Sequence, residues 1–186
     1  MTDRRTQILD AALAVLARNG ISGVSMRAVA RQAGLSVGLA NYYFDDKHGL
    51  ICAALERIAD ADAAMVTSDP DLDAETNLRQ ALHRIAAEEF LGLDHLALRL
   101  QLWSLAGVDP AYAAINQQAQ AAYLAGLETL LAAARPSLSP EAVRRRAEDI
   151  LVVQNGVWLT SVLVPNAATM RRAVTHTEAI AFADGT

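Results

Sequence analysis

The chain of 186 residues contains one cysteine, Cys52, and one lysine, Lys47. A single cysteine excludes a disulfide within the chain, and on an apolar segment it is expected to be a small core residue rather than a redox sensor. Aromatic residues make up only 5% of the chain, whereas 53% of it is hydrophobic, with alanine and leucine dominant. This composition favours helices and is ample for a buried core.

Two further absences concern membranes. The first residues are polar and charged, so the start does not have the pattern of a signal peptide. The longest apolar stretch, residues 157–164, is far too short to cross a bilayer. We therefore expect a cytoplasmic protein without a membrane partner.

Motifs of catalysis and cofactor binding are also missing. The four histidines are scattered without the spacing of a metal site, and there is no glycine-rich phosphate loop or nucleophile elbow. His48 and Cys52 lie four positions apart on an expected helix, which leaves a weak metal or thiolate site as an alternative. We predict no enzyme, no cofactor and no bound metal.

The pattern that remains is that of an all-α protein. Capping residues, prolines and glycines divide the chain into nine expected helices, and no segment is a convincing strand. The expected helices cover about residues 8–20, 26–33, 37–43, 47–66, 73–92, 94–107, 110–134, 140–163 and 167–182.

Residues 25–50, SMRAVARQAGLSVGLANYYFDDKHGL, carry the clearest functional signal. Ser25 is an expected N-cap, and Gly34 stands where a helix ends with a positive φ. Ser36 is a second N-cap, which starts a helix of about two turns. A helix, a glycine turn and a short second helix form the helix-turn-helix, which places its second helix in the major groove of DNA.

The short helix is expected to face the core with Ala40, Tyr43 and the adjoining Phe44, and to turn its remaining residues toward DNA. Asn41 has the groups for a bidentate contact to adenine, and Val37 and Leu39 suit thymine methyls. Donor-bearing side chains would contact phosphate and set the register. The remaining expected DNA contacts are the backbone at Gly38 and the donors of Ser25, Arg27, Ser36, Tyr42 and Lys47.

The combined motifs resemble the DNA-binding domain of the TetR/AcrR family of bacterial regulators. Asn41 departs from the family pattern, since many members carry a tyrosine there. The resemblance implies a DNA-binding domain at residues 1–46 and a helical ligand-binding and dimerisation domain at 47–186. The matching stretches are ILDAALAVLARNG, the S-x-x-x-V-A-x-x-A-G-L-S run from Ser25 to Ser36, Gly38, Tyr42-Tyr43-Phe44, Lys47 and Leu50.

The second half resembles BetI-type members of this family, which repress choline-to-betaine genes and respond to choline. The resemblance rests on Leu102-Trp103 with DPAY at 109–112, and on NGVWL at 155–159. It implies control by a small effector, choline or a related cation. Aromatic faces and a carboxylate, from Glu88, Glu89 or Asp94, suit a quaternary ammonium. The aromatic candidates are Phe90, Trp103, Tyr112, Tyr123 and Trp158, and each has a place in the core or the dimer interface as its alternative.

Dimerisation is expected through the last two helices, because a palindromic operator requires two DNA-binding domains in successive major grooves. The helix at 140–163 also has more apolar residues than one internal face needs. Gln154 and Asn155 need hydrogen-bond partners if they are buried, and bonds across the dimer are favoured over bonds in a ligand pocket. The run Arg144–Arg146 is expected to be solvated or at the interface. The proposed interface residues are Ile150, Val153, Gln154, Val157 and Val162.

The net charge of −5 is unevenly distributed along the chain. Residues 1–50 hold six basic and four acidic side chains, whereas the remainder holds ten basic and seventeen acidic ones. A mildly basic first domain on an acidic body suits contact with phosphate at one end. The sequence thus predicts a homodimeric, ligand-responsive repressor of a DNA operator. The alternative is an effector-independent DNA-binding protein whose second half only dimerises.

Overall fold

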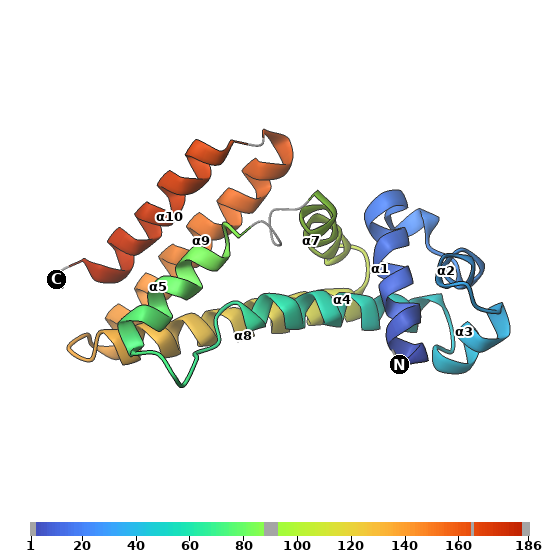
Figure 1. The fold of residues 1–186 in the computed structure, drawn as a ribbon, viewed down its shortest axis with the longest axis horizontal. Coiled ribbons are helices and arrows are strands. Elements are labelled where there is room, and N and C mark those ends of the chain that lie inside the picture. Colours follow the sequence, from blue (N-terminus) through green and yellow to red (C-terminus); the bar gives the residue numbers. More distant parts are fainter. Residues whose placement is uncertain (1–2, 88–92, 165, 184–186) are drawn as a thin grey trace. The chain divides into compact units, whose positions relative to one another are not determined.

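The structure is a computed structural model that describes residues 3–87, 93–164 and 166–183. Every regular element in these ranges is an α-helix, as the sequence predicts (Figure 1). None of the helices described is long and apolar enough to cross a membrane. The helices are α1 (Arg4–Gly23), α2 (Met26–Ala33), α3 (Val37–Tyr43), α4 (Lys47–Ala64), α5 (Ala74–Arg84), α7 (Leu93–Leu105), α8 (Pro110–Ala134), α9 (Pro140–Leu163) and α10 (Ala167–Phe182).

The described chain divides into two compact units. The first unit contains the residues up to Asp60 together with Ala97–Gln117, and the second contains Ala61–Leu96 and the residues from Gln118 onward. Helices α4, α7 and α8 each contribute residues to both units. The fold therefore places a segment from the middle of the sequence in the same unit as the first sixty residues.

The first unit has a continuous apolar core. Leu16 of α1, Val29 of α2 and Leu50 of α4 are almost completely buried there, because the apolar residues of each helix recur on one face. Helices α7 and α8 extend this core with side chains that lie far away in the sequence. These are Leu102, Leu105, Tyr112 and Ile115.

Helix α1 bends near its end. Gly20 has a φ of 63°, a left-handed conformation that strains any residue with a side chain. The sequence predicts that the helix ends at this glycine, whereas helical residues resume after the bend and reach Gly23. The bend allows the chain to turn into α2 without a long loop.

Helix α5 is shorter than the expected helix at 73–92. It begins after Asp73, whose carboxylate caps the helix by accepting a hydrogen bond from the Thr76 amide at 2.9 Å. It ends at Arg84, because the amides of Ala86 and Ala87 bond to carbonyls three residues back rather than four. The α-helical ladder is therefore not continued.

In the second unit, α9 and α10 lie side by side and antiparallel (Figure 1). Arg146, near the start of α9, is buried and donates hydrogen bonds to the carbonyls of Ala181 and Ala183 at the end of α10. The expectation of a solvated arginine run is therefore wrong for Arg146, because consecutive helical residues point in different directions. Arg144 is exposed and pairs with Glu148 at 3.2 Å.

We predict that Gly126→Ala destabilises the second unit. A Cβ at Gly126 of α8 would lie 2.4 Å from the Val66 Cγ2 atom and 3.2 Å from the Val66 carbonyl oxygen. This overpacking is expected to lower the free energy of unfolding by about 1–3 kcal/mol in urea denaturation. Gly107→Ala is the control, because a Cβ there meets no atom within 4 Å. Equal stability of both variants would contradict the close approach of α8 to Val66.

Candidate nucleic-acid interface and interior polar site

Helices α2 and α3 are bounded by the caps that the sequence predicts. The hydroxyls of Ser25 and Ser36 accept hydrogen bonds from the amides of Ala28 and Leu39, each at 3.1 Å. Gly34 ends α2 with a φ of 67°, and the Leu35 amide bonds back to the Ala30 carbonyl at 2.9 Å. This left-handed cap turns the chain within three residues, which sets α3 against α2 as in a helix-turn-helix.

Helix α3 presents most of the expected DNA-contacting residues to solvent. Ala40 is completely buried and the adjoining Phe44 nearly so, which anchors the inner face of the helix. On the outer face Tyr42 is 80% exposed, and Asn41 is exposed beside it. Leu39 is only half-buried, so its contact with a base would be partial. The other expected DNA contacts, Ser25, Arg27, Ser36, Val37, Gly38 and Lys47, are all exposed.

Lys47 is held in place at the start of α4. Its Nζ atom donates to the Ile21 carbonyl at 3.0 Å, so the start of α4 is tied to the end of α1. The Asp46 carboxylate accepts from the Gly49 amide at 2.8 Å and caps α4. An ammonium group has three donors, and the two that remain on Lys47 are available to phosphate.

A polar cluster links α4 to the start of α8 within the first unit. The His48 Nε2 atom lies 3.3 Å from an Asp109 carboxylate oxygen, and the imidazole stacks on the Tyr112 ring with centroids 5.1 Å apart. Its Nδ1 atom lies 3.9 Å from the Cys52 sulfur. Asp109 also caps α8, since it accepts from the Ala111 amide at 2.8 Å. The first turns of α4 and α8 are thus joined through one histidine.

This cluster does not favour the thiolate alternative for Cys52. Burial, followed by the charges of Glu56, Asp109 and Asp46, raises the pKa of the Cys52 thiol. A reactive cysteine needs the opposite environment, one that lowers the pKa and favours the thiolate. Burial also raises the pKa of the Tyr112 phenol above its usual range.

The aromatic residues expected to bind a ligand do not form one group. Trp103 and Tyr112 pack in the core of the first unit. This position agrees with the alternative to ligand binding, a place in the hydrophobic core. Tyr123 and Trp158 belong to the second unit, where their rings meet edge to face with centroids 6.2 Å apart. Phe90, together with Glu88 and Glu89, lies outside the described residues, as does the side chain of Asp94.

Tyr123 and Trp158 surround a buried glutamine. The Tyr123 hydroxyl donates to the Gln154 Oε1 atom at 2.9 Å, and all three side chains are almost inaccessible to solvent. Among the described residues the Gln154 Nε2 atom has no hydrogen-bond partner. The Gln154 side chain is therefore bonded within its own chain, and the expected bond across a dimer stays a prediction. A donor left over in an apolar interior is suited to a ligand that carries an acceptor.

The second unit also contains a buried carboxylate that the sequence reasoning missed. Asp62 of α4 is 5% exposed, and one of its oxygens lies 3.7 Å from the Nε2 atom of His95 on α7. One sequence feature could have indicated it. Asp62 lies among alanines in the run Ala61–Ala64, at a position that helical periodicity places on the buried face of the helix. Asp60, two residues earlier, is exposed, so the two aspartates have different environments.

The expected interface residues of α9 are mostly internal. Ile150, Gln154 and Val157 are buried within a single chain, and Val153 and Val162 are half-buried. The apolar residues that do face solvent are instead Val152, Leu159, Leu163 and the following Val164. The single chain therefore already covers Ile150, Gln154 and Val157, and the interface set expected from the sequence stays a prediction.

Known proteins match both parts of this architecture. Residues 8–54 match the profile of the tetR family of bacterial regulatory proteins, and residues 74–181 match the C-terminal profile of BetI-type transcriptional repressors. The chain belongs to the TetR family and is of the BetI type. The first match contains the helix-turn-helix, and the second contains Tyr123, Gln154 and Trp158.

Individual relatives agree with this assignment. The chain is 29% identical to the HTH-type transcriptional regulator BetI of Paraburkholderia phymatum, over 86% of this chain and 82% of that protein. A transcriptional regulator from Pseudomonas aeruginosa PAO1 has a similar structure, with a TM-score of 0.79 and 26% identity over 95% and 88% of the two chains. The multidrug binding protein EbrR, solved with proflavin, has a TM-score of 0.61 and 26% identity over 96% and 99%. This TetR-family chain therefore shares its whole architecture with transcriptional regulators.

We predict that Tyr123→Phe destabilises the protein by leaving Gln154 without its only described donor. A buried acceptor that loses its partner costs about 1–3 kcal/mol. The double variant Tyr123→Phe/Gln154→Leu removes both polar groups and is expected to regain part of this loss. Urea denaturation of the wild type, the two single variants Tyr123→Phe and Gln154→Leu, and the double variant measures this effect. Strictly additive effects would mean that the two side chains do not interact.

Proposed function

We propose that this TetR-family regulator is a ligand-responsive repressor that binds a palindromic DNA operator as a homodimer. The observation that carries the proposal is the outer face of α3. A capped helix with Asn41 and Tyr42 exposed follows a tight left-handed turn, and this is the arrangement that reads a major groove. The division into a DNA-binding part at 1–46 and a ligand-binding and dimerisation part at 47–186 belongs to the same proposal.

The proposed assembly has two copies because one α3 reads only one half-site. Two half-sites about one helical turn of DNA apart require two recognition helices related by a two-fold axis. The last two helices of the second unit supply the contact between copies. The activity is binding rather than catalysis, and the place of action is the cytoplasm, where the DNA is.

The proposed effector is a small cation, with choline or a related quaternary ammonium as the first candidate. The rings of Tyr123 and Trp158 offer the faces that attract a cation, and Asp62 provides a buried carboxylate in the same unit. EbrR, which resembles this chain, was solved with the cationic dye proflavin. The BetI-type match of residues 74–181 supports the same class of ligand.

The proposed control is a shift between two states of the dimer. Helix α4 begins with Lys47 and His48 beside the recognition helix and ends, at Ala64, just after Asp62. An effector that contacts Asp62 in only one state would therefore bias a helix that also positions the DNA contacts. The size of the response is limited by the difference in effector affinity between the two states.

We predict different losses for neighbouring residues of α3 and α4. Tyr42→Ala and Lys47→Ala are expected to weaken binding to operator and to random DNA alike, because both side chains are proposed to contact phosphate. Lys47→Ala is also expected to lower the slope of log affinity against log salt concentration by about 1. Asn41→Ala is expected to cost about 1–3 kcal/mol on the operator only. Fluorescence anisotropy at several salt concentrations measures all three. Tyr42→Phe, which removes only the hydroxyl, separates the hydrogen bond from ring contacts.

If Asn41→Ala lowered the affinity for operator and for random DNA equally, Asn41 would not be a residue that reads a base. Failure of the wild-type protein to bind any duplex chosen from a random pool would contradict the proposed function itself. DNA from upstream of the protein's own gene is the first sequence to use as an operator.

We predict that choline weakens operator binding about 5-fold or more, the usual lower range of allosteric coupling. Operator affinity at fixed salt is measured with and without choline, and with proflavin as a second cationic probe. Asp62→Asn is expected to keep the DNA affinity and lose the response, because it removes the charge and keeps the shape. An operator affinity unchanged by either cation would favour the alternative, an effector-independent DNA-binding protein whose second half only dimerises.

A further inference from the structure

The first unit has a pocket with ionisable side chains at the start of α4. Its volume is about 510 Å³, and Asp46, Lys47, His48 and Tyr112 are among the residues that line it. Lys47 is one of the proposed phosphate contacts. The pocket therefore lies beside the surface that is proposed to bind DNA, and it contains a histidine that the proposed function does not use.

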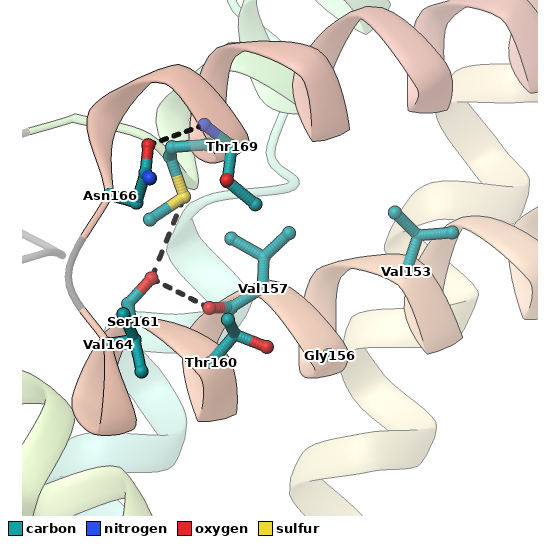
Figure 2. A pocket seen from close by; sticks show the side chains of 9 residues that line it. Val153, Gly156, Val157, Thr160, Ser161, Val164, Asn166 and Thr169 are labelled. Carbon is teal, nitrogen blue, oxygen red and sulfur yellow. Dashed lines mark hydrogen bonds between the residues drawn. The ribbon is translucent and has the colours of Figure 1, made fainter.

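The groove between α9 and α10 in the second unit has a different chemistry (Figure 2). Figure 2 shows the Ser161 hydroxyl donating to the Val157 carbonyl at 2.7 Å, and the Asn166 side-chain oxygen accepting from the Thr169 amide at 3.0 Å. None of the described residues that line this groove has an ionisable side chain. Of these two pockets, only the one at the start of α4 can change its charge with pH.

His48 is held by contacts on three sides of its ring. The Nε2 atom lies 3.3 Å from one Asp109 oxygen, the Nδ1 atom lies 3.9 Å from the Cys52 sulfur, and the ring stacks on Tyr112 at an interplanar angle of 23°. The other Asp109 oxygen accepts from the Ala111 amide, which fixes the carboxylate at the start of α8. The His48 side chain is also 49% exposed, so a proton from solvent can reach it.

Each of these contacts is compatible with a positive charge on the ring. In the neutral ring the Nε2–H donates to Asp109, and an added proton goes to Nδ1, so that both nitrogens become donors. The carboxylate and the aromatic face of Tyr112 both attract the resulting cation. Burial raises the pKa of the Cys52 thiol, so the sulfur keeps its own proton and can act as a weak acceptor for Nδ1–H.

The charges around His48 are unbalanced when its ring is neutral. Asp46 and Asp109 are two carboxylates, whereas Lys47 supplies a single ammonium group, and the excess negative charge opposes the approach of phosphate. A proton on His48 removes this excess. The groups that face the ring are Asp46, Lys47 and Cys52, with Glu56 acting on Cys52, and Asp109 and Tyr112 of α8, while α1 contributes the uncharged Ile21 and Ser22.

We propose that His48 is a proton-binding site through which operator binding takes up a proton, so that operator affinity falls as the pH rises. The inference rests on the proposed function, because it requires a DNA phosphate on Lys47. Charges act on one another over about 8–10 Å at physiological salt, and Lys47 and His48 line one pocket. A phosphate bound by Lys47 therefore favours the charged ring of His48 over the neutral ring.

Operator affinity is accordingly expected to be highest at low pH. A complex that holds the proton more tightly than the free protein gains affinity below the pH at which the free ring loses its charge. The gain disappears once the pH is high enough for the ring to lose its charge in the complex as well. Histidine changes its charge between about pH 5 and 8, and one proton limits the change in affinity to about tenfold per pH unit.

The test is the operator affinity of the full chain at fixed salt, measured by fluorescence anisotropy between about pH 5 and 8. The wild type is expected to lose about tenfold in affinity across this range. His48→Gln keeps a donor toward Asp109 but cannot titrate, so its affinity is expected to be low and independent of pH. His48→Lys carries a permanent charge, and its affinity is expected to stay high throughout.

His83→Gln is the matched control. His83 is an exposed histidine whose Nε2 atom also lies beside a carboxylate oxygen, that of Glu178 at 3.0 Å, but it belongs to the second unit. This variant is expected to keep the pH profile of the wild type. Asp109→Asn keeps a side-chain oxygen that can cap α8 and is expected to move the profile to lower pH, because an amide does not stabilise a cationic ring.

Isothermal titration calorimetry in two buffers of different ionisation enthalpy counts the protons directly. Near pH 7 the wild type is expected to take up part of one proton when it binds the operator, and His48→Gln is expected to take up none. If His48 had only a structural role, its loss would lower the affinity equally at every pH and would leave proton uptake unchanged. Circular dichroism at each pH confirms that the variants are folded, and if His48→Gln is unfolded, His48→Lys decides by the same criteria.

The outcomes separate the two proposals. A wild type that binds no duplex at any pH overturns the proposed function and the proton link with it. A wild type that binds its operator equally well at every pH and takes up no proton overturns only the proton link. Proton uptake that persists without His48 overturns its assignment to this residue, whereas uptake that is lost in His48→Gln and kept in His83→Gln supports it.

Discussion

The recognition helix α3 is only seven residues long, and an isolated helix of this length is not stable in water. Its shape is maintained by the Ser36 cap at one end and by the burial of Ala40 and Phe44 on its inner face. The outer face can then be polar or aromatic without loss of structure. DNA binding therefore depends on a core that α3 itself barely contributes to, and this core includes residues from the middle of the chain.

That shared core has a consequence for control. Tyr112 and Asp109, at the start of α8, contact the same histidine that begins α4 beside the recognition helix. Helix α4 also carries Asp62, a buried carboxylate of the second unit. Within the first unit, the start of α8 is therefore joined to the start of α4 through packed side chains.

The second unit has a buried polar group without a described hydrogen-bond partner, and it also has large apolar side chains exposed to solvent. The polar group is the donor of the buried Gln154 amide, and the apolar side chains are those of Val152, Leu159 and Leu163 of α9. Both features reduce the stability of a single chain in water. The first suits a ligand and the second suits another copy, so binding partners would supply stability that the isolated chain lacks.

The sequence by itself determined the all-α class, most helix boundaries and the helix-turn-helix, because caps, glycine turns and periodic apolar residues act over only a few positions. It also indicated the outer residues of α3, since a short helix with one buried face leaves few alternatives. The family resemblance extended this to the TetR assignment, which the profile matches confirm.

Only the tertiary structure decided which aromatic residues lie together. Trp103 and Tyr112 pack in the first unit, whereas Tyr123 contacts both Trp158 and Gln154 in the second. It also decided which side of α9 is covered, so that Ile150 and Gln154 became internal and Val152 and Leu163 external. The physical reason is that a helix with two apolar faces does not by itself specify which of the two is buried. The elements that pack against it, far away in the sequence, select the buried face.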